Sequence, residues 1–249
     1  FEIAPNGRFI ALTTCPDERL ITHEGQSRID IYDRKEKETI TLSGTLFREK
    51  APSPYGWIED MAWSPDSELL AFRVGWDGYP DRLYTARIWL DRRLSTMRRV
   101  NRPDDGVNVA GNLAWRPGTR DLCFLGEWRA LQHIYAIKDV TMLDQGEHQV
   151  LAAGNRQITA FRFLPGGKPV AIACAPDHGR NLFRVEGTNT LHRLTDINPQ
   201  MATWKLPQIS LVNWQGADGD RVEGVLELPY GHDREKDGPL PLVVELHGG

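Results

Sequence analysis

The chain has 249 residues, 40% of them hydrophobic and 26% charged, which is the composition of an ordinary globular protein rather than a disordered one. Its formal net charge of −4 comes from interspersed acids and bases, so neither a basic face for nucleic acid nor a polybasic run for a membrane surface is expected. No stretch approaches the roughly 18 apolar residues of a membrane span. The length admits one large domain or two smaller ones.

The cysteines and the first residue are the features of the sequence that relate to where in the cell the protein is located. Cys15, Cys123 and Cys174 are an odd number without the spacing of metal ligands, so neither a disulfide framework nor a metal site is expected. Phe1 is not a start methionine and already lies in a patterned segment, so we expect a chain that is cut at both ends. We expect a cytoplasmic protein, and a targeting signal before Phe1 stays open.

From Phe1 onward the chain repeats one pattern four times. Four prolines with matching neighbours mark the copies: Pro5, Pro65, Pro117 and Pro165. A large apolar residue stands two positions before each proline: Ile3, Trp63, Trp115 and Phe163. A small residue stands six positions after each proline, between two larger apolar ones: Ala11, Ala71, Cys123 and Ala171. A fixed period of this kind is the mark of a repeat architecture.

Each copy is predicted to form four short antiparallel strands. Residues such as Asn6-Gly7 and Gly166-Gly167, directly after the prolines, favour a tight hairpin turn between the first two strands. The third strands carry an aromatic residue: Tyr32, Tyr84, Tyr135 and Phe183. The fourth strands are expected at Thr39–Leu42, Met97–Val100, Gln149–Leu151 and Leu191–Leu194.

Four strands in roughly 40 to 50 residues are typical of a β-propeller blade. We therefore expect a mainly β chain whose residues 1–200 form a partial propeller of about four blades, with further blades before Phe1. The small residues fit close packing between neighbouring sheets, and Cys123 takes an alanine's place as a small buried hydrophobe. Trp63 and Trp115 are expected in the core between sheets rather than as stacking platforms for a ligand.

The pattern breaks after Thr195, and residues 196–206 are expected to be a linker. Gln208–Trp214 and Arg221–Leu228 alternate as two strands around an Asp218-Gly219 turn. A charged loop over residues 229–239 follows. Leu242–Leu246 is then predicted to be a buried strand that leads into His247-Gly248-Gly249.

A strand followed by His-Gly-Gly has a chemical meaning. In α/β-hydrolases of the lipase and esterase type, such a turn directs a backbone N–H at the oxyanion of a tetrahedral intermediate. On these residues alone, a Gly-Gly turn that merely ends a strand is an equally good interpretation. The preceding hairpin favours the first interpretation, so residues 204–249 are predicted to begin an α/β-hydrolase domain.

At this point the residues resemble a known family. Trp63-Ser64-Pro65-Asp66, the Asp218-Gly219 hairpin, the Gly224–Pro229 segment and Pro241–Gly249 are similar to segments of the prolyl oligopeptidase family of serine peptidases. The similarity is closest to its acylaminoacyl-peptidase and dipeptidyl-peptidase-like branches, and it covers essentially the whole chain. It implies a Ser-Asp-His hydrolase for short peptides, in which the propeller covers the active site and excludes large folded substrates.

The resemblance assigns roles only to the last three residues. Gly249 would lend a backbone N–H to the oxyanion hole, Gly248 would permit the turn, and His247 would be a structural member of the motif rather than the catalytic base. No Gly-x-Ser-x-Gly occurs in the sequence, so the nucleophile and the rest of the triad are not in this chain, which should be inactive alone. No cofactor is expected, and self-association stays open.

Two other sets of residues are candidates for a binding site. The remaining histidines show no ligand spacing, so solvated loop positions are expected for His23, His133, His148, His178, His192 and His232. Glu59-Asp60 stands just before an inner strand, where some members of the family hold a substrate's amino terminus. Adjacent acids on a loop are more often simply solvated.

Two alternatives to a peptidase remain. A non-catalytic TolB-like propeller would bind a protein partner through its face, but it has no need of the segment after residue 208. A carboxylesterase would use the same oxyanion geometry on small esters.

Overall fold

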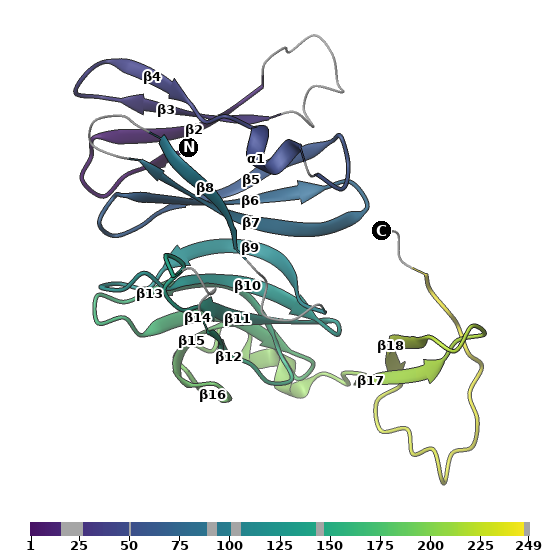
Figure 1. Cartoon of the computed structure of the whole chain (residues 1–249). Coiled ribbons are helices and arrows are strands. Elements are labelled where there is room, and N and C mark those ends of the chain that lie inside the picture. Colours follow the sequence, from purple (N-terminus) through teal and green to yellow (C-terminus); the bar gives the residue numbers. More distant parts are fainter. Residues whose placement is uncertain (16–26, 50, 89–93, 101–105, 143–146, 247–249) are drawn as a thin grey trace.

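The computed structural model describes residues 1–15, 27–49, 51–88, 94–100, 106–142 and 147–246 (Figure 1). Nearly all of its regular structure is β, as the repeat predicts. The first antiparallel sheet has four strands in chain order: β1 (Glu2–Ile3), β2 (Phe9–Thr14), β3 (Arg28–Asp33) and β4 (Glu38–Thr41). A short helix, α1 (Thr45–Arg48), lies between this sheet and the next.

The second sheet repeats the arrangement with longer strands: β5 (Gly56–Trp63), β6 (Leu69–Trp76), β7 (Tyr79–Ile88) and β8 (Leu94–Val100). Trp76 pairs with Tyr79 across a two-residue turn at Asp77-Gly78, because Gly78 at a φ of 71° permits a tight reversal.

The remaining copies of the repeat form one eight-stranded sheet. One half is the antiparallel set β9 (Asn108–Trp115), β10 (Leu122–Trp128), β11 (Leu131–Ile137) and β12 (His148–Ala152). The other half is β13 (Gln157–Phe163), β14 (Pro169–Ala175), β15 (His178–Gly187) and β16 (Thr190–Arg193). A single parallel pair, Gln132 with Gln157, joins β11 to β13. Apart from this bridge, each half repeats the four-stranded order of the first two sheets.

The prolines mark hairpin turns, as predicted. In three copies the N–H of the second residue after the proline donates to the carbonyl of the residue before the proline, three positions back. The donor residue has a positive φ: 69° at Gly7, 62° at Ser67 and 75° at Gly167. This is a type I turn followed by a left-handed residue, a common hairpin loop. In the remaining copy Thr119 donates to Arg116 O at 3.2 Å, and Gly118 at a φ of 73° takes the left-handed position.

Alternation along the second strands places the core between successive sheets. On β6, Leu70 and Phe72 face the first sheet, whereas Ala71 faces Trp115 and its neighbours in β9 to β11. On β10, Cys123 likewise faces the cluster built from β13 to β15. The small residues Ala11, Ala71, Cys123 and Ala171 are all at most 1% exposed. The prediction that small side chains allow close packing between sheets is confirmed.

The two repeat tryptophans tie neighbouring sheets together. Trp63 Nε1 donates to Glu2 O at 3.1 Å, and Trp115 Nε1 donates to Ala62 O at 2.9 Å. Glu2 and Ala62 hold equivalent positions in the repeat, three residues before the proline. Both rings are buried at 7% exposure, so their predicted place in the core is confirmed. Phe163 stands at the same position, and its side chain has no N–H to donate.

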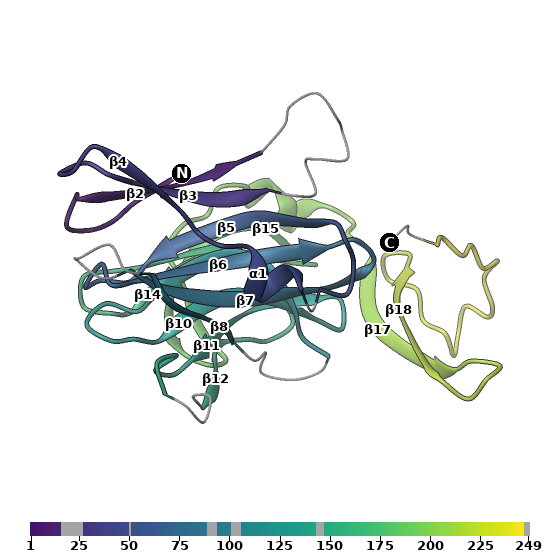
Figure 2. The same cartoon turned by 45° about the horizontal axis from the view of Figure 1, so that its top comes forward.

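The segment after the repeats leaves the stacked sheets, and Figure 2 shows it beside them. A 3₁₀ turn, η2 (Pro199–Thr203), interrupts the predicted linker. β17 (Gln208–Gln215) and β18 (Arg221–Leu228) then form the predicted hairpin, with Gly219 at a φ of 86°. No helix in the described ranges is both long and apolar enough to cross a bilayer.

The expectation of a buried strand over Leu242–Leu246 is wrong for this structure. The segment forms no strand, and Leu242, Val243 and Leu246 are 76%, 88% and 88% exposed. The physical reason is that a strand needs a hydrogen-bonding neighbour, and no strand in the described part of the chain pairs with it. The Val and Leu residues of this segment give it the sequence pattern of a strand, but the pattern does not provide the neighbouring strand with which it would pair.

Candidate functional site

The predicted oxyanion turn cannot be placed. His247, Gly248 and Gly249 lie outside the described residues, and the segment that leads to them is exposed. The sequence also contains no Gly-x-Ser-x-Gly motif that could supply a nucleophilic serine beside this turn. The site that the structure does build lies on three neighbouring strands of the second sheet, β5, β6 and β7.

This site is centred on Arg73 in β6, and we call it the Arg73 cluster: Arg73, Glu59, Asp60 and Asp81. β5 has a bulge between Ile58 and Met61, so two adjacent acids leave the regular ladder together. Asp81 stands near the start of β7, the strand on the other side of β6. The two neighbours of β6 therefore bring three carboxylates to one guanidinium.

The contacts within the cluster are ion pairs. Arg73 contacts Glu59 and Asp81 through its two terminal nitrogens, and its Nε lies 3.4 Å from Asp60 Oδ2. Arg73 and Asp81 are nearly buried, with side chains 14% and 16% exposed, whereas Glu59 is 44% exposed. A planar guanidinium with several donors is suited to hold more than one carboxylate. The cluster therefore binds β5, β6 and β7 together at one end of the sheet.

The third sheet contributes backbone and amide groups to the same place. Asn112 N donates to Asp60 Oδ2 at 3.1 Å, and Asp81 N donates to Asn108 Oδ1 at 3.2 Å. Gly111 has a φ of 116°, and a Cβ built there would lie 2.6 Å from Asp60 Oδ2. Glycine is thus required at this position both by the backbone and by the close carboxylate.

The charge balance of the cluster is negative, with three carboxylates around one arginine. An excess of carboxylates attracts cations and amines. However, Glu59 and Asp60 both contact Arg73, so an incoming amine would have to compete with an internal partner. Glu59 and Asp60 are thus ion-paired members of the Arg73 cluster rather than free, solvated side chains.

A chain of hydrogen bonds links the first strands of three successive copies, β5, β9 and β13. Asp60 in β5 and Asn112 in β9 each stand five residues before their repeat proline. Asp60 accepts from Asn112 N, and Asn112 Oδ1 in turn accepts from Phe161 N in β13 at 2.9 Å. Asn112 and Arg73 were not among the candidates from the sequence. The shared offset of Asp60 and Asn112 from the prolines was a signal that could have found the pair.

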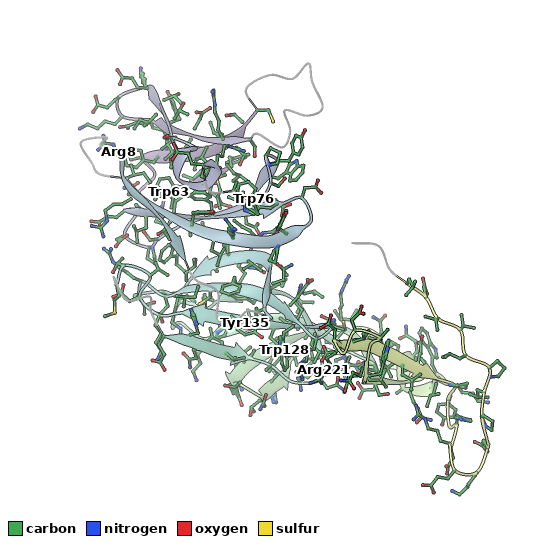
Figure 3. All side chains as sticks on the ribbon, turned by 45° about the vertical axis from the view of Figure 1, so that its right-hand side comes forward. Arg8, Trp63, Trp76, Trp128, Tyr135 and Arg221 are labelled. Carbon is green, nitrogen blue, oxygen red and sulfur yellow. The ribbon has the colours of Figure 1, made fainter. Side chains whose placement is uncertain are left out.

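Two open hollows lie elsewhere on the molecule. One of about 430 Å³ is lined by aromatic and imidazole groups of β10 to β12, including Trp128, His133, Tyr135 and His148. Figure 3 shows the labelled Trp128 and Tyr135 on this part of the sheet. The other, of about 600 Å³, lies between β17 and the loop that carries His232. Neither contains the ion pairs of the Arg73 cluster.

The histidines are mostly not the solvated loop residues that were expected. His133, His148, His178 and His192 lie in β11, β12, β15 and β16. His133 is 6% exposed, and its Nε2 lies 2.9 Å from Gly154 O. His23 lies outside the described residues. Within the described ranges, no group of three or more His, Cys, Asp or Glu side chains could hold a metal ion.

Comparison with known proteins gives a result only at the level of structure. No family model matches the sequence, and no curated protein matches it. A structure from a study of two prolyl endopeptidases has a TM-score of 0.56 at 14% identity, over 96% of this chain and 32% of that one. The AtxE2 isopeptidase has a TM-score of 0.51 at 14% identity, over 94% and 39% of the two chains.

A periplasmic gluconolactonase from Pseudomonas aeruginosa has a TM-score of 0.49 at 16% identity, over 90% of this chain and 63% of that one. The chain thus spans between about a third and under two thirds of the length of these solved structures. At such low identity the likeness concerns the fold. The chain has a nearly all-β, propeller-like fold that is shared, at low sequence identity, with parts of S9-family peptidases.

Proposed function

We propose that this chain is the propeller and the opening of the catalytic domain of a serine peptidase of the prolyl oligopeptidase family. The observation that carries the proposal is a coupling: four repeat copies of four strands each are followed directly by an antiparallel hairpin and an apolar segment ending in His-Gly-Gly. The four copies would be four blades. The likeness in fold to a prolyl endopeptidase and an isopeptidase supports this assignment.

The exposed surface of the C-terminal segment fits this assignment. On one face of the hairpin, Ile209, Leu211 and Val225 are 38%, 45% and 56% exposed, and Val244 further along is 69% exposed. Exposed apolar faces of this kind are suited to become buried when further elements of a domain pack on them. In the proposed protein those partners are the later strands and helices of an α/β-hydrolase domain.

The proposed chemistry assigns only the oxyanion turn to this chain. Gly249 would offer its backbone N–H to the tetrahedral intermediate, Gly248 would allow the close turn, and His247 would support it. The serine nucleophile, the aspartate and the histidine base would come from residues that are not among these 249. Without a nucleophile the chain alone is expected to hydrolyse nothing.

The proposed substrates are short peptides, in keeping with the acylaminoacyl-peptidase and dipeptidyl-peptidase-like branches. Stacked sheets beside an active site would restrict access to extended, unfolded segments. The negative Arg73 cluster adds a polar surface at one end of β5, β6 and β7.

The test is an assay of the product of the complete gene on peptide nitroanilides and on acyl esters, with covalent labelling by a fluorophosphonate. Turnover of the peptides, together with labelling of one serine, is expected. The 249-residue chain serves as the control and should neither turn over substrate nor become labelled. Turnover of esters alone would indicate a carboxylesterase, and absence of both activities would indicate a binding propeller; either result contradicts the peptidase.

A further inference from the structure

An ion pair connects the C-terminal hairpin to the stacked sheets. Arg129 Nε, in the turn between β10 and β11, lies 3.3 Å from Glu223 Oε1 in β18. Arg221 Nε lies 3.2 Å from the same Glu223 oxygen, but from within the hairpin itself. Figure 3 shows the labelled Trp128 and Arg221 where the hairpin meets the sheets. Glu223 is thus shared between a local partner and a partner from the sheets.

The turn that carries Arg129 has an unusual backbone. Trp128 pairs with Leu131, so the loop between them has only two residues, and their φ angles are 52° at Arg129 and 58° at Ala130. Two successive left-handed residues define a type I′ turn, which strongly prefers Asn-Gly. Arginine and alanine both carry a Cβ that disfavours this conformation. Such conformations persist where the surroundings fix them, and they concentrate at functional places.

The surroundings do fix this turn. Gln157 in β13 donates its side-chain amide to Ala130 O at 2.6 Å, which ties the loop to the neighbouring strand. The Arg129 guanidinium lies 4.3 Å from the centroid of the Trp128 ring, within the range of a cation–π contact. The turn backbone and the Arg129 guanidinium are therefore both held in place by contacts other than the one with Glu223.

We propose that Arg129 is a positioning residue that sets the orientation of the β17–β18 hairpin relative to the sheets through Glu223. The left-handed backbone, the hydrogen bond from Gln157 to Ala130 O and the contact with the Trp128 ring together restrict the conformation of Arg129. The side chains of Arg129 and Glu223 are 39% and 34% exposed, so the pair is weak and reversible rather than permanent. The hairpin thus docks on the turn and can leave it. This role goes beyond the proposed peptidase activity and does not depend on it.

The experiment measures the distance between spin labels on the two parts of the 249-residue chain. Asn189→Cys places one label on the exposed turn between β15 and β16, and Ala217→Cys places the other on the hairpin turn. Cys15→Ser and Cys174→Ser remove the less buried thiols, whereas Cys123 is buried and stays. Arg129→Gly and Glu223→Gln should each raise the ratio of undocked to docked hairpin about fivefold, and so broaden the distance distribution.

Two matched variants separate orientation from folding. Arg221→Ala removes the local partner of Glu223 and should leave the distribution narrow. Arg129→Gly relieves the left-handed strain, so its melting temperature should not fall although its hairpin moves more. High salt should broaden the parent's distribution, because it screens an exposed pair. The proposal is wrong if Arg129→Gly keeps the parent's narrow distribution, or if Arg221→Ala broadens it as much as Arg129→Gly does.

Discussion

The side-chain amide of Asn112 is paired with the backbone of Phe161 in both directions. Phe161 N donates to Asn112 Oδ1 at 2.9 Å, and Asn112 Nδ2 donates to Phe161 O at 3.3 Å. Asn112 lies in β9 and Phe161 in β13, the first strands of two successive copies of the repeat. An amide side chain thus supplies hydrogen bonds where strands splay apart and no backbone ladder joins them.

Replacing Asn112 should destabilise this junction. Asn112→Ala leaves the Phe161 N–H and C=O without these partners, and we expect the free energy of unfolding to fall by about 1–3 kcal/mol. Part of that loss would come from the backbone, because Asn112 has a φ of 53°, which asparagine tolerates better than alanine. Asn112→Gly is the control, since it removes the amide and accepts the backbone. A glycine variant as stable as the parent in urea unfolding would show that the amide contributes nothing.

The indole of Trp115 should contribute through its N–H as well as its ring. Trp115→Phe keeps an aromatic ring but removes the donor to Ala62 O, so we expect a loss of about 1 kcal/mol in the free energy of unfolding. Trp204, which is 54% exposed, offers a matched control. Trp204→Phe should leave the urea midpoint unchanged. Equal midpoints for Trp115→Phe and the parent would mean that the hydrogen bond is energetically neutral.

Cys123 should be the least reactive of the three thiols. It is fully buried, and burial raises the pKa of its thiol to about 12, so almost no thiolate exists at neutral pH. Cys15 is exposed. A thiol reagent added to the native chain should modify Cys15 quickly and Cys123 only after denaturation, as peptide mass mapping would show. Rapid native labelling of Cys123 would mean that the contact between the third and fourth copies opens readily.

The repeat could be read from the sequence because its signals are local. Proline with a following glycine, asparagine or aspartate fixes a turn, and alternation of apolar residues fixes which side of a strand is buried. These rules placed the hairpins, the third-strand aromatics and the small residues at Ala71 and Cys123 correctly. They also placed Trp63 and Trp115 in the core. The linker and the hairpin around Asp218-Gly219 followed from the same signals.

The polar features could not be read in the same way, because they join residues far apart in the chain. Arg73 contacts acids from both neighbouring strands, and which acids it reaches depends on a bulge in β5 that no composition rule announces. Leu242–Leu246 shows the opposite failure. Its local pattern is that of a strand, but strand formation depends on a neighbour that the described part of the chain does not place beside it.

Arg73 should be needed to hold its three acids together. Arg73→Met keeps much of the apolar stem but leaves Glu59, Asp60 and Asp81 without their cation, and we expect a loss of about 1–3 kcal/mol in the free energy of unfolding. High salt should reduce the deficit by screening the repulsion. Arg180→Met, at an exposed position of β15, is the control. A deficit that does not change with salt would indicate lost packing rather than lost charge.

Asp33 and Arg8 should make stability depend on acid. The Arg8 guanidinium donates to both oxygens of the buried Asp33 carboxylate, at 3.0 Å and 2.7 Å, and chiefly this contact lowers the pKa of Asp33 from 3.8 to about 2. Because the pKa is lower in the folded state, the stabilisation is fully present above the unfolded value. It is lost as the pH falls through about 4 towards about 2.

Asp33→Asn removes this titration while keeping the size of the side chain. We expect the variant to be less stable than the parent at neutral pH, and the difference in unfolding free energy to shrink between about pH 5 and about pH 2. Asp177→Asn, at a side chain that is 86% exposed, should show no such trend. Urea unfolding at several pH values measures both. A parent and an Asp33→Asn variant that differ equally at every pH would show that the carboxylate's charge does not stabilise the fold, whatever its hydrogen bonds contribute.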